Sequence, residues 1–219
     1  MSGPRIQLIH AVTAAQAPIH AAFQRLWPAA RTVDLADMSL APDVAAAGRL
    51  TDAFTRRMAA LIGYGVECGA DAILFTCSAF GAAIEKARAG VAIPVLKPDE
   101  AMIGEALSLG ARIGGLATFR PTIGSLTAEI EAAAKKRNLK PALDIRFVPD
   151  ALDALNAGDG ARHDKLVADA AAGIDAADVL VLAQFSMVGA RDAVVAKANG
   201  RPVLTAPDEA VKKLRALLG

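Results

Sequence analysis

The sequence has few aromatic residues, almost no net charge and no long apolar run. Its 219 residues include 7 Phe, 1 Trp and 1 Tyr, and 24 Lys and Arg are balanced by 23 Asp and Glu. Nucleic-acid binding uses basic surfaces interleaved with aromatic residues, so we expect no nucleic-acid partner. No apolar run approaches the ~20 residues of a membrane-spanning helix, and the first residues lack a signal-peptide pattern. We therefore expect a cytoplasmic protein without membrane contact.

Cysteine and histidine are also scarce. Cys68 and Cys77 are the two cysteines, too few for a disulfide framework and wrongly spaced for zinc. The histidines, His10, His20 and His163, lie far apart and form no metal-binding motif. No predicted strand is followed by GxGxxG, and a P-loop is absent. These absences argue against a metal site and against nucleotide binding.

What the sequence does have is an internal repeat. Three blocks recur in the same order at an offset of 107 or 108 residues, and each pair shares most of its apolar pattern. They are RIQLIHA and RIGGLAT, ADAILFTCSAFG and ADVLVLAQFSMVG, and PVLKPDEA and PVLTAPDEA. The period is too long for a solenoid and instead predicts a duplicated chain with two similar lobes. In this register Cys77 corresponds to Gln184.

Each half alternates short β-branched runs with longer segments of helical period, which indicates parallel strands joined by helices. We predict an α/β fold of two pseudo-symmetric lobes, residues 1–101 and 102–219, with helices near the ends packing across lobes. Each lobe is a four-stranded parallel sheet flanked by helices, with the active site in the cleft between the lobes. The predicted strands are 6–9, 32–35, 72–76 and 93–96 in the first half, and 113–117, 143–148, 179–183 and 203–205 in the second.

Ligands of open parallel sheets bind beyond the carboxyl ends of the strands, and Cys77 lies at such a position. It stands between Thr76 and Ser78, where a strand passes into a helix. The free N–H groups of that helix would favour the thiolate, so we expect a pKa below the ~8.5 of a free thiol. The alternative is that Cys77 only fills the core, which is how we interpret Cys68 in the tail of a helix.

The Thr76-Cys77-Ser78 block and the ATxxxT loop from Ala117 to Thr122, in a duplicated α/β chain of this length, resemble the aspartate/glutamate racemase superfamily. This superfamily includes amino-acid, hydantoin and allantoin racemases, maleate isomerases and arylmalonate decarboxylases. The resemblance covers essentially the whole chain. It implies a small carboxylate substrate, a reactive cysteine, and chemistry without pyridoxal phosphate, any other cofactor or a metal.

The racemases of this superfamily place one cysteine in each lobe, and here the second is missing. The resemblance assigns the first cysteine to Cys77 and the second position to Gln184. A carboxamide orients a ligand but does not exchange a proton at neutral pH. Ser186 lies close by in sequence, and His10, expected on the loop after the first strand, is a conceivable replacement base. The alternative for His10 is a solvated or capping residue.

Small polar side chains at the predicted strand ends suit a carboxylate ligand. For Thr118 and its neighbours, helix initiation is an additional role, because Thr suits an N-cap and Pro the first turn. The Pro-Asp-Glu segments at Asp99-Glu100 and Asp208-Glu209 are interpreted as favourable first turns of helices. The expected substrate-binding residues are Thr76, Ser78, Thr118, Arg120 and Thr122, assisted by Gln184.

These features lead to a cofactor-independent racemase or isomerase acting on a small carboxylate through Cys77 and an enediolate or thioether intermediate. One alternative is a decarboxylase of a malonate-type acid, in which the thiol protonates the enediolate. A second alternative is a protein that binds a small acid without turnover. The alanine-rich helices offer surfaces for subunit packing, so we expect a homo-oligomer, as a dimer.

Overall fold

The computed structural model describes residues 3–219, which form two compact units. The first unit contains the residues up to Ala101 together with Ala210–Gly219, and the second contains Met102–Glu209. The sequence analysis placed Ala210–Gly219 in the second lobe and expected helices near the ends to pack across lobes; in the structure this segment groups with the first unit. Val211 and Leu214 in this segment have no exposed surface.

The first unit is built on a parallel sheet with the strand order β2-β1-β3-β4. Its strands are β1 (Arg5–His10), β2 (Arg31–Ala36), β3 (Ala72–Phe75) and β4 (Val95–Leu96), and its helices are α1 (Gln16–Leu26), α2 (Leu40–Ala47), α3 (Asp52–Glu67) and α4 (Gly81–Ala87). Short 3₁₀ turns at Thr13–Ala15 and Ser78–Phe80 precede α1 and α4.

The second unit repeats this order as β6-β5-β7-β8, again with every pair parallel. Its strands are β5 (Arg112–Ala117), β6 (Ala142–Phe147), β7 (Val179–Leu182) and β8 (Val203–Thr205), and its helices are α6 (Pro121–Lys136), α7 (Ala151–Asn156), α8 (Gly160–Ala172) and α9 (Arg191–Lys197). A 3₁₀ turn at Phe185–Ala190 precedes α9. The predicted α/β fold with two four-stranded parallel sheets is therefore confirmed.

The two sheets also share their register. Ile6 pairs with Ala72 in the first sheet, and Ile113 pairs with Val179 in the second, so the same separation joins the two central strands. A one-residue slip would exchange the two faces of a strand, and equal register therefore buries equivalent side chains. All four central strands are buried along almost their whole length, as expected of a parallel sheet covered on both faces.

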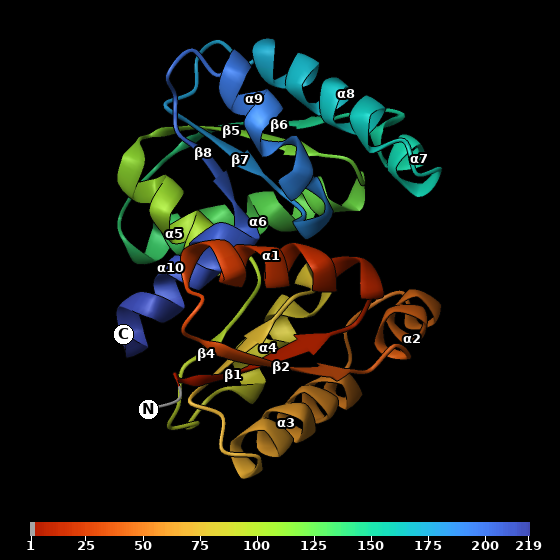
Figure 1. Ribbon diagram of the computed structural model, residues 1–219, viewed down its shortest axis with the longest axis vertical. Helices are drawn as coiled ribbons and strands as arrows, with labels where there is room; N and C mark the ends of the chain where they lie inside the picture. The colour runs from red at the N-terminus through yellow and green to blue at the C-terminus, as the bar shows by residue number, and fades with distance from the viewer. Residues whose placement is uncertain (1–2) are drawn as a thin grey trace. The chain divides into compact units, whose positions relative to one another are not determined.

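Helices cover both faces of each sheet (Figure 1). In the first unit α3 and α4 pack together on one face through Phe54, Met58 and Ile84, and α1 lies on the other. In the second unit α8 and α9 pack on one face through Val167 and Val194, and α6 lies on the other. At their carboxyl ends most strands pass into a loop or a 3₁₀ turn, whereas β8 passes directly into the helix that begins at Ala206.

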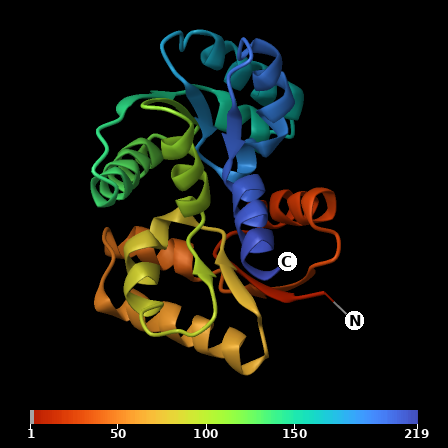
Figure 2. The same ribbon diagram turned by 90° about the vertical axis from the view of Figure 1, so that its left-hand side faces the viewer.

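Two helices contain residues of both units. They are α5 (Glu100–Leu109) and α10 (Ala206–Leu218). Figure 2 shows the end of α10 (blue) next to α1 (red), where Arg215 Nη1 donates a hydrogen bond to Leu26 O at 3.0 Å. Among residues 3–219, no helix combines the length and the apolar character needed to cross a membrane.

Candidate functional site

Cys77 lies in the loop that follows the buried central strand β3. It immediately precedes the 3₁₀ turn Ser78–Phe80, is half-buried, and packs against the core under α3 and α4. Ser78 next to it is half-buried as well. The thiol therefore sits at the carboxyl edge of the sheet, as the sequence predicted, with a side chain only partly withdrawn from solvent.

The expectation of a depressed Cys77 pKa is wrong. Burial raises the pKa of this thiol, an effect that the hydrogen bond from the Ala79 backbone opposes and the Asp99 carboxylate reinforces. The helix that was expected to stabilise the thiolate begins only at Gly81 and has 7 residues. A dipole effect falls off within the first turn, so little of it reaches Cys77. At neutral pH the group is a thiol.

Asp99 was interpreted from the sequence only as a helix-opening residue. It lies in the loop after β4, is 5% exposed, and acts electrostatically on Cys77. Because β4 is the neighbour of β3, the loops after these two strands meet at one edge of the sheet. That adjacency was the signal that could have identified Asp99. The acidic first turns themselves are confirmed, by Glu100 in α5 and by Asp208 and Glu209 in α10.

Arg88 holds the loop that carries Asp99. Its Nη1 donates to Val95 O at 2.7 Å and to both Glu100 carboxylate oxygens at 2.8–2.9 Å. Its Nη2 donates to Glu85 at 2.5 Å. One guanidinium thus ties the end of α4 to β4 and to the start of α5. The chain before and after Asp99 is thus anchored at Val95 and Glu100.

The sequence analysis expected His10 on the loop after the first strand, and this expectation is wrong. His10 is the last residue of β1 and is fully buried. Its Nδ1 lies 2.8 Å from Thr76 Oγ1, and its Nε2 lies 2.9 Å from Asp34 Oδ1 on β2. The Thr76 hydroxyl also lies 3.3 Å from Ile9 O. A side chain with no exposed surface cannot meet a ligand directly, so His10 acts, if at all, through Thr76.

A second histidine, His20, also lies within hydrogen-bond distance of Asp34. His20 on α1 places its Nε2 2.9–3.0 Å from the two Asp34 carboxylate oxygens, and Thr32 Oγ1 lies 3.3 Å from its Nδ1. Burial lowers the pKa of His10, the hydrogen bond and charge of Asp34 oppose this, and His20 adds to the lowering. His10 is therefore neutral near pH 7. No pattern in the sequence indicates this cluster, because residues of β1, β2 and α1 contribute to it.

In the second unit Gln184 occupies the position that Cys77 occupies in the first. Each follows the central strand by one intervening residue and precedes a 3₁₀ turn. Gln184 Oε1 accepts hydrogen bonds from the backbone N–H of Thr118 at 2.7 Å and from the Thr118 hydroxyl at 3.1 Å. Among the described residues Gln184 Nε2 has no hydrogen-bond partner, so its two N–H donors are not committed to another residue. Thr118 is 2% exposed, and both its backbone N–H and its hydroxyl donate to Gln184.

The other predicted residues of this unit lie at the same edge of the sheet. Thr122 is largely buried in the first turn of α6, and Ser186 is half-buried in the 3₁₀ turn after Gln184. Arg120 is exposed, with its Cζ 4.1 Å from the centroid of the Phe147 ring. A hollow of about 300 Å³ opens here, and its lining includes Thr118, Arg120, Phe147, Asp150 and Asp153.

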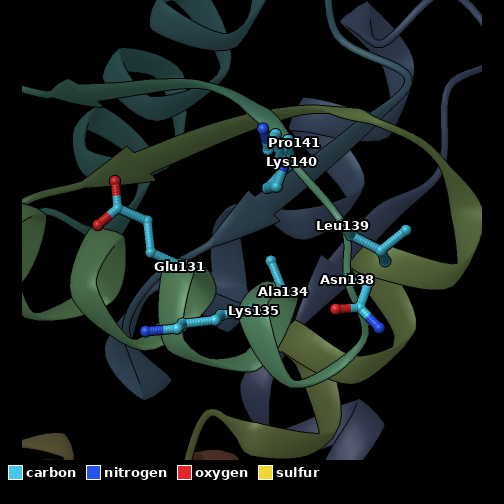
Figure 3. Close-up of a pocket in the computed structure, with 7 residues that line it drawn as sticks. All are labelled: Glu131, Ala134, Lys135, Asn138, Leu139, Lys140 and Pro141. Atoms are coloured by element: carbon cyan, nitrogen blue, oxygen red, sulfur yellow. The ribbon is translucent and has the colours of Figure 1, made fainter.

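A larger hollow of about 520 Å³ lies at the opposite edge of this sheet, near the start of β6 (Figure 3). Glu131 and Lys135 reach it from α6, and Asn138 and Leu139 come from the following loop. None of the predicted site residues lines it. In residues 3–219 no three His, Cys, Asp or Glu side chains are grouped as a metal site would need.

Comparison with known proteins bears on this arrangement. The family model described as Asp/Glu/Hydantoin racemase matches residues 10–217, nearly the entire chain. The chain belongs to the Asp/Glu/Hydantoin racemase family. The resemblance seen in the sequence is thereby confirmed, although no curated protein sequence matches the chain significantly.

Solved structures from the same superfamily have the same fold. Glutamate racemase RacE1 from Bacillus anthracis gives a TM-score of 0.74 at 14% identity, over 100% of this chain and 82% of that one. Allantoin racemase from Klebsiella pneumoniae gives 0.73 at 20% identity, over 98% and 87%. A glycine-to-cysteine variant of arylmalonate decarboxylase gives 0.66 at 19% identity, over 99% and 94%. At these identities the likeness concerns the fold.

Proposed function

We propose that this racemase-family chain is a cofactor-independent isomerase that acts on a small carboxylate, with Cys77 as the reacting group. The observation that carries the proposal is the position of Cys77: a half-buried thiol beyond the central strand β3, next to the buried carboxylate of Asp99. Ligands of open parallel sheets bind at this edge. Family membership supplies the reaction type.

In the proposed reaction the thiolate form of Cys77 removes the proton next to the substrate carboxylate, and the thiol returns it. The charge that develops is an enediolate, which needs hydrogen-bond donors. Gln184 has two such donors on Nε2, held in place because Thr118 fixes its Oε1. Arg120 adds a positive charge at the same edge of its sheet. Thr76 and Thr118 cannot donate their hydroxyl protons to the substrate without breaking the bonds described above.

Proton exchange in heavy water tests the proposal without knowledge of the natural substrate. A panel of amino acids, hydantoins and substituted malonates is incubated with the protein, and deuterium at the acidic carbon is followed by NMR. Cys77→Ala should lower incorporation by about 10²–10⁴-fold, because it removes the acid-base group. Cys68→Ser is the matched control and should keep it, since Cys68 lies at the end of α3. Full incorporation by Cys77→Ala would refute the assignment.

The same assay separates binding from chemistry at Gln184. Gln184→Ala should lower the rate of deuterium incorporation by about tenfold to a hundredfold, because an orienting hydrogen bond contributes about 1–3 kcal/mol. Gln184→Cys places a thiol at the equivalent position of the second sheet and should add a second group that exchanges protons. Equal labelling of both enantiomers by the unmodified protein from the first turnovers would mean that a second acid-base group already exists.

A decarboxylase is the second candidate, and the raised pKa of Cys77 favours it. A group that stays protonated at neutral pH is suited to protonate the enediolate left by loss of carbon dioxide. If the protein releases carbon dioxide from a substituted malonate and Cys77→Ala does not, the decarboxylase assignment is supported. Protection of Cys77 from iodoacetamide by a dicarboxylate, without any exchange or decarboxylation, would instead indicate a binding protein.

A further inference from the structure

The strand β6 lies at the edge of the second sheet, where it pairs with β5 on one side. The N–H of Ala142 donates to Ala111 O at 2.7 Å, and that of Val148 donates to Ala117 O at 2.8 Å. Even-numbered residues of β6 therefore turn their backbone groups toward β5. The residues that turn these groups outward are Leu143, Ile145 and Phe147. Among residues 3–219 the outward N–H and C=O groups have no hydrogen-bond partner.

This edge lacks the features that usually prevent pairing with another chain. Proteins protect an open strand edge with proline, lysine or a bulge. From residue 142 to residue 147 there is no proline or lysine, and the pairing with β5 runs without a bulge. The two charged side chains, Asp144 and Arg146, are exposed and of opposite sign. They bond to each other within the strand, at 2.6–3.1 Å. The edge is therefore open to a further strand.

A second copy of β6 fits this edge when it runs antiparallel about a two-fold axis at Ile145. Ile145 then faces Ile145 of the second copy, and Leu143 faces Phe147. Both pairs join residues whose backbone groups turn outward, as the hydrogen-bonded pairs of an antiparallel ladder require. In the intervening position Asp144 faces Arg146, where side chains approach most closely. Opposite charges across a ladder stabilise it, so the strand is complementary to itself.

Charge also selects this register from the two neighbouring ones. An axis at Asp144 still pairs outward backbone groups, but it sets two Asp144 carboxylates directly against each other. An axis at Arg146 does the same with two guanidinium groups. Like charges directly opposite each other destabilise a strand pair. Of these three registers, the one centred on Ile145 alone pairs opposite charges.

The corresponding edge of the first sheet, β2, is not complementary to itself. Its backbone alternation with β1 turns Thr32, Asp34 and Ala36 outward. A two-fold axis at the middle residue would set two Asp34 carboxylates against each other, which is unfavourable. The same carboxylate also lies within hydrogen-bond distance of His10 and His20. Charge thus distinguishes the edges of the two sheets.

We propose that β6 is the contact surface of a homodimer, in which the β6 strands of two copies pair antiparallel about a two-fold axis at Ile145. The sheets of the two second units then form one continuous sheet. A single strand pair is smaller than a standard interface of ~1,200–2,000 Å², so the dimer should dissociate on dilution. The sequence analysis expected subunit packing through alanine-rich helices, whereas this contact lies on a strand. It is independent of the proposed reaction, which uses no residue of β6.

Sedimentation equilibrium of the full-length protein tests the register through charge. The unmodified protein should show a monomer–dimer equilibrium. Asp144→Arg makes both cross-strand pairs entirely basic, and Arg146→Asp makes them entirely acidic, so each variant should lower the association constant by about tenfold or more. An equal mixture of the two variants should dimerise, because every cross-strand pair then joins opposite charges. The double variant, Asp144→Arg with Arg146→Asp, should form a homodimer again.

The mixture also controls for the loss of the ion pair within the strand, since both of its components lack that pair. A protein that stays monomeric at every concentration would overturn the proposal. So would a dimer that neither single variant weakens, or a mixture as monomeric as its components while the double variant is folded and also monomeric.

Proline substitution tests the backbone ladder independently of charge. Leu143→Pro removes an outward N–H and keeps the bonds to β5, and proline is tolerated on an edge strand in this orientation. It should lower the association constant by about tenfold, because symmetry removes two hydrogen bonds. The far-UV circular dichroism should stay unchanged. Ala36→Pro on β2 is the matched control and should leave the association constant in place. An unaffected dimer in Leu143→Pro, or equal weakening in both variants, would contradict the proposed contact.

Discussion

At the scale of single residues, the protein contrasts two side chains in equivalent positions of its two sheets. Cys77 packs against the core of the first unit near Asp99, and both features favour its protonated form. Gln184 is fixed by two hydrogen bonds from Thr118 and presents N–H donors. A thiol exchanges a proton and an amide only donates hydrogen bonds. The equivalent loops of the two sheets therefore carry side chains of different chemistry.

Cys77 should titrate above the ~8.5 of a free thiol, because burial and the Asp99 carboxylate both disfavour the thiolate. In a Cys68→Ser background, the iodoacetamide rate should rise with pH and bend only above that value. Asp99→Asn removes one of the two causes and should move the bend to lower pH. A bend at or below ~8.5 in the unmodified thiol would contradict this prediction.

At the scale of elements, the two sheets agree more closely than the helices that cover them. The sheet order and the register of the central strands are the same, whereas the 3₁₀ turn before α4 has 3 residues and the one before α9 has 6. Side-chain alternation permits no slip in a buried strand, but a turn at the edge can lengthen without disturbing the core. The two units thus differ in the turn that follows the central strand, where Cys77 and Gln184 lie.

Gly114 on β5 is required by close packing. An added Cβ would lie 2.8 Å from both Ile174 Cγ2 and Leu180 Cδ2, and 3.0 Å from Ala177 Cβ. Gly114→Ala should therefore lower the free energy of unfolding by about 1–3 kcal/mol in urea denaturation, as overpacked cores do. Gly124→Ala in α6 is the control, because its Cβ meets nothing within 4 Å. It should raise stability by about 0.5–1 kcal/mol. If Gly114→Ala left the free energy of unfolding unchanged, the strand would be able to shift and accommodate the added methyl group.

At the scale of the whole molecule, the first unit is discontinuous in sequence. Its sheet comes from the residues up to Ala101, and Ala210–Gly219 belongs to the same compact unit. Leu214 in that segment has no exposed surface, and Arg215 bonds to Leu26 O. If each half of the duplicated chain folded on its own, Ala210–Gly219 would belong to the second unit rather than the first. We therefore expect the stability of the first unit to depend on Ala210–Gly219.

Leu214→Ala should destabilise the first unit, although it lies 113 residues beyond Ala101. The loss of a fully buried leucine side chain costs about 2–5 kcal/mol in other cores. Hydrogen exchange should accelerate in β1 and α1, and Leu217→Ala is the control because Leu217 is 47% exposed. Faster exchange confined to the second unit would show that this segment stabilises the other core.

The sequence alone was sufficient to predict the fold, its duplication and the place of Cys77. The eight strands were found because burial on both faces produces continuous apolar runs, a local property of the chain. The correspondence of Cys77 and Gln184 followed from the repeat. The strand after Ile93 proved shorter than predicted, as β4 contains only Val95 and Leu96. Such boundaries depend on pairing with a neighbour and are not encoded locally.

Tertiary structure decided what surrounds these residues. His10, Asp34 and His20 meet only because β1, β2 and α1 assemble side by side, and no spacing in the sequence indicates that contact. Asp99 comes close to Cys77 because β4 pairs with β3. The direction of the Cys77 pKa shift likewise depends on burial, which is a property of the assembled core rather than of the Thr-Cys-Ser block. Local pattern determines elements and reactive residue types, whereas desolvation and long-range hydrogen bonds determine their protonation.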